Sequence, residues 1–118
     1  MNLLEQLFKH MTKLTDQNIE DPLEKEETMN KILVFYKSSF DVNDNDTTQQ
    51  ILEKLPAIYF IEEYSKLLFY RHGASDKKDK GMLHKALELV QYLNSADKTY
   101  SWDRAVLEQD ILRLLDEN

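Results

Sequence analysis

The sequence contains only two glycines and two prolines among 118 residues, and this scarcity limits the folds open to it. Sandwiches and barrels of many short strands need frequent tight turns, which depend on these two residue types. The composition includes 42% hydrophobic and 31% charged residues, enough for both a core and a solvated surface. We therefore expect an all-α fold, formed as a single domain over residues 1–118.

Apolar residues recur at the spacing of one helical face in several segments. In the first segment Leu3, Leu7 and Met11 share a face, while Lys9 and Lys13 lie on the other side. The same reasoning along the chain predicts a bundle of about five helices. We expect them near residues 2–14, 22–39, 47–72, 79–95 and 101–116.

Start signals for three of these helices stand in the sequence. Asp21 is a predicted N-cap followed by Pro22 at the first helical position. Thr47 with Gln50 has the spacing of a capping box, with Asp46 as an alternative cap. Ser101 is the predicted cap of the last helix.

Proline and glycine also mark the third predicted helix, 47–72. Pro56 disfavours helical geometry at Leu55, so we expect a kink or a break there. The part after it is apolar nearly all round, which indicates a central helix enclosed by neighbours. Gly73 is expected in a left-handed conformation just beyond its end.

The stretch Asp41 to Glu53 is rich in side-chain oxygens and invites comparison with a calcium-binding loop. Such a loop requires glycine at its sixth position and a bidentate glutamate at its twelfth. Asp46 and Leu52 occupy these two positions. We therefore predict a solvated loop that separates two helices, and no calcium site.

Two other pairs of side chains, one of carboxylates and one of a histidine with a carboxylate, are candidates for a chemical site. Glu62 and Glu63 are neighbours on a helix and point about 100° apart, so they cannot converge on one substrate atom. We expect Glu62 to pair with Lys66 at the surface and Glu63 to be salt-bridged or solvated. His84 and Glu88 share a helical face, but a metal needs further ligands.

The sequence also excludes several classes of enzyme. Without cysteine there is no disulfide, thiolate nucleophile or cysteine zinc site, and two isolated glycines form no phosphate-binding loop. We expect no catalytic residue, no cofactor and no metal. An enzyme or small ligand-binding bundle that uses Glu63 or His84 is kept as an alternative.

The chain is acidic, with a net charge of −7 and a pI near 4.9. This charge opposes binding to nucleic acid or anionic membranes, since both depend on clustered lysine and arginine. No segment approaches the about 20 apolar residues of a membrane span, and no targeting sequence is evident. We expect a cytoplasmic protein with a protein partner, and the charge favours a basic one; a homo-oligomer is a further alternative.

Two groups of residues are candidates for contacting this partner. Acidic residues gather around the start of the second predicted helix, and Glu20, Glu26 and Glu27 are the ones that the helix dipole explains least well. Tyr100 and Trp102 are aromatic side chains of the kind enriched at binding hot spots. The favoured function is a non-catalytic protein-interaction module. By charge and architecture the chain is also similar to small acidic helical immunity proteins, so an inhibitor of a basic toxin or enzyme is the alternative.

Overall fold

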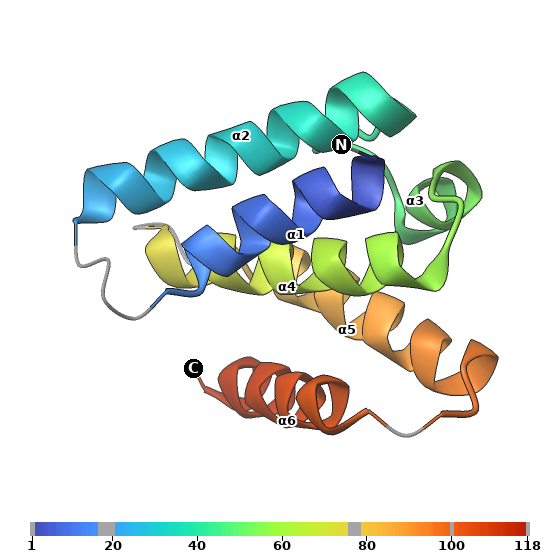
Figure 1. The fold of residues 1–118 in the computed structure, drawn as a ribbon. Coiled ribbons are helices and arrows are strands. Elements are labelled where there is room, and N and C mark those ends of the chain that lie inside the picture. Colours follow the sequence, from blue (N-terminus) through green and yellow to red (C-terminus); the bar gives the residue numbers. More distant parts are fainter. Residues whose placement is uncertain (1, 17–20, 76–78, 100, 118) are drawn as a thin grey trace. The chain divides into compact units, whose positions relative to one another are not determined.

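The computed structural model describes residues 2–16, 21–75, 79–99 and 101–117, and these residues form six helices and no strand (Figure 1). The all-α prediction is therefore confirmed. The chain divides into two compact units, Met1–Asp46 and Thr47–Asn118, which are described separately. That the chain is one domain stays a prediction.

The first unit is a hairpin of α1 (Leu3–Leu14) and α2 (Pro22–Phe40), which pack against each other (Figure 1). The predicted start of α2 is confirmed. The side chain of Asp21 accepts a 3.0 Å hydrogen bond from the amide of Leu23, and Pro22 is the first helical residue. The buried apolar residues of this unit are Leu7, Met11, Leu14, Met29, Ile32, Phe35, Tyr36 and Val42.

The oxygen-rich stretch after α2 closes a turn by internal hydrogen bonds. Asp41 ends α2 in the left-handed conformation, with φ of 58°, and its carboxylate lies 2.7 Å from the ammonium group of Lys37. The buried side chain of Asp46 accepts a 2.9 Å hydrogen bond from the amide of Asn43. Asp46 thus stabilises the turn, and the alternative that it caps the next helix is wrong.

The next helix, α3 (Thr48–Lys54), begins with the predicted capping box. Thr47 Oγ1 accepts a 3.2 Å hydrogen bond from the amide of Gln50, and Gln50 Oε1 accepts a 2.8 Å bond from the amide of Thr47. Each side chain therefore satisfies a backbone donor that the helix itself leaves unbonded.

Pro56 separates α3 from α4 (Ile58–Ala74) completely. Leu55 adopts an extended conformation, with φ of −89° and ψ of 127°, as expected for a residue before proline. The predicted break is confirmed. It also explains why the described residues contain six helices where about five were expected.

The end of α4 differs from the prediction. Gly73 lies within the helix, which continues to Ala74, and no described glycine has positive φ. The amide of Ser75 donates to the carbonyl of His72 at 3.3 Å, so a tightened last turn satisfies this end of the helix. Glycine permits the left-handed conformation but does not impose it.

In the second unit α4 packs along α5 (Lys80–Ala96), and α5 also contacts α3 and α6 (Trp102–Asp116). Eight of the seventeen residues of α4 are buried, but α5 has the larger number of helical neighbours, so the two helices share the central position. The buried apolar residues of this unit are Ile51, Leu55, Phe60, Ile61, Tyr64, Leu67, Leu68, Leu83, Ala86, Leu89, Val90, Leu93, Leu107 and Ile111.

The capping box predicts a measurable loss of stability. Thr47→Ala should lower the free energy of unfolding by about 1 kcal/mol, because the Gln50 amide loses its acceptor. Urea denaturation followed through the fluorescence of Trp102, the single tryptophan, measures the unfolding of Thr47–Asn118. Gln49→Ala, an exposed site in the same helix, is the control and should cost less than about 0.5 kcal/mol. Equal losses in both variants would contradict the capping role.

Candidate functional site

The start of α6 is fixed by its own side chains. Ser101 caps the helix, and its hydroxyl oxygen accepts a 3.2 Å hydrogen bond from the amide of Arg104. The predicted cap is therefore confirmed. Because Trp102 and Asp103 lie between these two residues, this bond also fixes their backbone.

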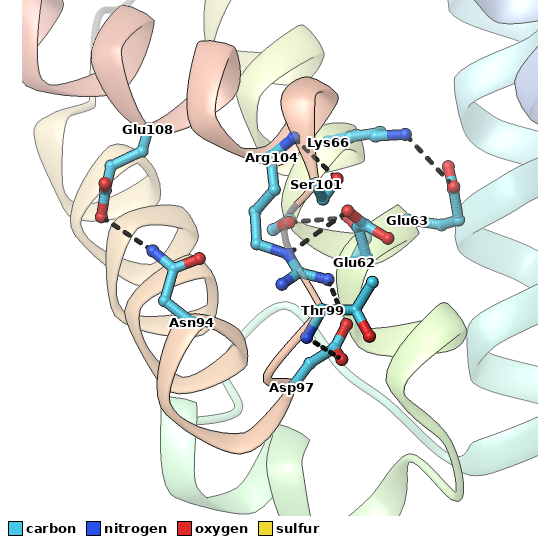
Figure 2. A network of polar contacts seen from close by, with 10 residues as sticks. Glu62, Glu63, Lys66, Asn94, Asp97, Thr99, Ser101, Arg104 and Glu108 are labelled. Atoms are coloured by element: carbon cyan, nitrogen blue, oxygen red, sulfur yellow. Dashed lines mark hydrogen bonds and ion pairs between the residues drawn. The ribbon is translucent and has the colours of Figure 1, made fainter.

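Arg104 points from α6 toward Glu62 of α4, and its side chain is buried at 3% exposure (Figure 2). Its Nη2 atom donates a 3.0 Å hydrogen bond to Asp97 Oδ2. Its Nε atom lies 3.4 Å from Glu62 Oε1 of α4, within ion-pair distance but without hydrogen-bond geometry. A buried guanidinium is tolerated when carboxylates compensate its charge, and here two do so.

The carboxylate of Asp97, the first residue after α5, accepts hydrogen bonds from two donors. The amide of Thr99 donates to Asp97 Oδ1 at 3.1 Å, and Arg104 donates to the other oxygen. The hydrogen bond from Thr99 first, and the one from Arg104 second, lower the pKa of the Asp97 carboxyl below its ordinary value. The connection between α5 and α6 is thus tied to the first turn of α6.

The predicted ion pair between Glu62 and Lys66, both in α4, is wrong. Glu62 pairs with Arg104, and Lys66 lies 3.3 Å from Glu63 Oε1 (Figure 2). Neighbouring positions on a helix point in different directions, and the buried cation of α6 lies on the side of Glu62. The sequence could not reveal this, because Arg104 is 42 positions away along the chain.

Glu63 is 8% exposed and salt-bridged, one of the two outcomes expected for it. Burial raises the pKa of its carboxyl, and the nearby ammonium group of Lys66 opposes this shift. The negative charges of Glu62 and Asp103 add smaller upward contributions to the same pKa. Burial is therefore the main cause of the raised pKa of Glu63.

The other candidate for chemistry, His84, lies exposed on α5, as does Glu88. In residues 2–16, 21–75, 79–99 and 101–117, no three His, Asp or Glu side chains are grouped as a metal site would require. Neither His84 nor Glu88 makes a hydrogen bond or an ion pair with another of the residues that the structure describes. The alternative function through Glu63 or His84 stays a prediction.

The acidic candidates lie at the start of α2. Glu26 and Glu27 are exposed, whereas Glu24 lies 3.6 Å from Lys13 of α1. Residues 1–46 contain ten acidic and five basic side chains, so they carry −5 of the net charge of −7. Glu20, the third acidic candidate, lies outside the described residues.

The aromatic candidates flank the cap of α6. Trp102 is 71% exposed at the first helical position, the most exposed large hydrophobic side chain in the described part of the chain. Tyr100 lies outside the residues that the structure describes. Sequence reasoning thus found Trp102 but missed Arg104, which supports the turn that carries it. A signal for Arg104 existed, because a cation in the first turn of a helix opposes the helix dipole and calls for a specific partner.

Removing the buried cation should destabilise the second unit strongly. Arg104→Met leaves Glu62 and Asp97 without their shared partner and should lower the free energy of unfolding by about 3 kcal/mol. Urea denaturation followed by Trp102 fluorescence measures the loss. The matched control is Arg113→Met in the same helix, whose exposed pair with Asp110 at 3.3 Å should contribute less than about 1 kcal/mol.

The difference between wild type and Arg104→Met should depend on pH. Asp97 has a lowered pKa in the folded protein, so its contribution is present above the pKa of the unfolded chain. This contribution is lost as the pH falls through the lowered, folded value. The stability gap should therefore narrow in acid, and a gap that widens in acid would contradict the assignment.

The two neighbouring glutamates of α4 should respond in opposite ways to neutralisation. Because the pKa of Glu63 is raised in the folded state, native stability should fall as the pH rises through that folded value. Glu63→Gln removes this loss and should be at least as stable as wild type at neutral pH, with the difference closing in acid. Glu62→Gln should be less stable than wild type, since Arg104 loses a full negative charge. Thermal unfolding across a pH series measures both, and a marked destabilisation by Glu63→Gln would refute the analysis.

Comparisons with known proteins add no family to this description. No family model, curated protein or solved structure matches the chain. Within the described residues, no helix is both long enough and apolar enough to cross a membrane.

Proposed function

We propose that the chain is a non-catalytic protein-interaction module whose acidic surface engages a basic protein partner. The observation that carries the proposal is a pair of exposed carboxylates, Glu26 and Glu27, on α2. Neither makes an ion pair with any residue that the structure describes. Their charge is thus available to a partner.

The helix dipole accounts poorly for these two residues. Its stabilising effect on carboxylates falls off within the first turn. Asp21 and Glu24 occupy that turn of α2, and both make local contacts, Asp21 with the amide of Leu23 and Glu24 with Lys13. Glu26 and Glu27 lie beyond it, so their local benefit to the helix is small.

Apolar side chains share the outer face of α2 with these carboxylates. Leu23 is 70% and Val34 is 62% exposed, and they lie at helical spacings that place them on the same side as Glu26 and Glu27. A surface that combines exposed aliphatic groups with charge is typical of protein-protein contacts, where the apolar part gives affinity and the charge steers the encounter. The net charge of −7 favours a basic partner.

The proposal predicts a local electrostatic effect on association. The chain is used as bait in an extract of its native source, and the captured protein is then tested purified. Glu26→Gln with Glu27→Gln should slow association several-fold and make it less sensitive to salt, because two charges that steer the partner are lost. Surface plasmon resonance at several salt concentrations measures both.

A matched double variant separates this local effect from overall charge. Glu53→Gln with Glu88→Gln removes two exposed carboxylates from the second unit and changes the net charge equally. If both double variants slow association to the same degree, the charge on α2 has no special role. A captured partner that is a basic toxin or enzyme, inhibited on binding, would make the chain an inhibitor of the immunity type.

A further inference from the structure

The first turn of α6 holds an exposed tryptophan in a fixed place. Trp102 is the single tryptophan of the chain, and most of its side chain is open to solvent. The Ser101 cap precedes it, and the buried Arg104 follows it two residues later. The backbone that carries the indole is therefore ordered before any partner arrives, which lowers the entropy cost of binding through it.

The side chains beside Trp102 extend this surface. Asp103 and Val106 are both exposed, and positions i, i+1 and i+4 of a helix fall within a sector of about 100°. Asp103 makes no ion pair with the described residues. We call Trp102, Asp103 and Val106 the α6 docking surface: an aromatic face, a carboxylate and an aliphatic group on adjoining positions.

The buried side of the same helical turn contacts α4. The ion pair of Glu62 with Arg104 joins the first half of α4 to the first turn of α6. Tyr59, one turn before Glu62, is also exposed.

A single exposed apolar side chain needs no functional explanation, since many are found on any protein surface. The combination with Asp103 is more informative. The indole face attracts cations, and an adjoining carboxylate adds an ion pair for the same cation.

We infer that the α6 docking surface binds an arginine side chain of a protein partner together with an apolar residue next to it. The guanidinium stacks on the indole of Trp102 and is attracted by the negative charge of Asp103 at the adjoining position, while the apolar residue packs on Val106. Arginine suits this arrangement better than lysine because its planar group can stack on an aromatic face. The inference rests on the proposed function and supplies the chemistry of the partner.

The probe for this surface is a short synthetic peptide of alternating arginine and leucine. Its control is the same peptide with citrulline in place of arginine, which keeps the shape and removes the positive charge. Binding of the arginine peptide should change the fluorescence of Trp102, and the citrulline peptide should bind about tenfold more weakly or not at all. Equal binding of both peptides would overturn the inference.

Variants then locate the peptide on the chain. Isothermal titration calorimetry should show that Trp102→Ala and Asp103→Asn each weaken the arginine peptide about three- to tenfold, while circular dichroism confirms that both still fold. Glu53→Gln with Glu88→Gln, which removes two exposed carboxylates elsewhere on the same unit, is the control for general attraction to an acidic protein and should change binding less than twofold. If this control weakens the peptide as much as Asp103→Asn does, binding follows overall charge and the inference is wrong.

The natural partner distinguishes this inference from the proposed function. If the partner captured by the wild type binds Trp102→Ala with about tenfold lower affinity, both stand. If it binds Trp102→Ala as tightly as wild type, the α6 docking surface is refuted while the interaction module survives. If the wild type captures no partner yet the arginine peptide still binds selectively at Trp102, the proposed function fails and the site remains.

Discussion

The burial of one cation, Arg104, determines how the second unit is arranged around the start of α6. A guanidinium placed in the interior requires opposite charge, and the two carboxylates that supply it come from different parts of the chain, Glu62 in α4 and Asp97 at the end of α5. Satisfying the one charge therefore fixes three segments together. The apolar core alone, which tolerates some sliding of helices, would specify this arrangement less sharply.

The local features of the fold were predictable because they depend on residues close in sequence. The caps at Asp21, Thr47 and Ser101 each use a side chain that bonds an amide two or three positions later, so short windows of sequence contain the whole interaction. Pro56 acts on the residue before it. The end of α4 was missed because glycine at position 73 permits several endings and the sequence does not select one.

The candidate site was predictable only in part, and the reason is again distance along the chain. Trp102 could be identified from residue type and position, whereas the role of Arg104 depends on Glu62, which tertiary packing brings to it. The exchange of partners between Glu62 and Glu63 has the same origin. The i,i+4 spacing on the helix predicted that Glu62 pairs with Lys66. In the structure Glu62 pairs with Arg104, which is distant in sequence, and Lys66 pairs with Glu63. At shorter range, Asp46 accepts a hydrogen bond from the amide of Asn43, and Thr47 is the cap of α3.

The boundary between the two units has a consequence for how such a chain can change over generations. The turn that Asp46 closes with Asn43 belongs to the first unit, and the capping box of Thr47 and Gln50 opens the second. Each side of the junction thus has local hydrogen bonds of its own. Residues inserted between Asp46 and Thr47 would leave both sets of contacts intact, so this junction is a place where the gene can acquire extra length, or be joined to another coding segment, with little damage to either half.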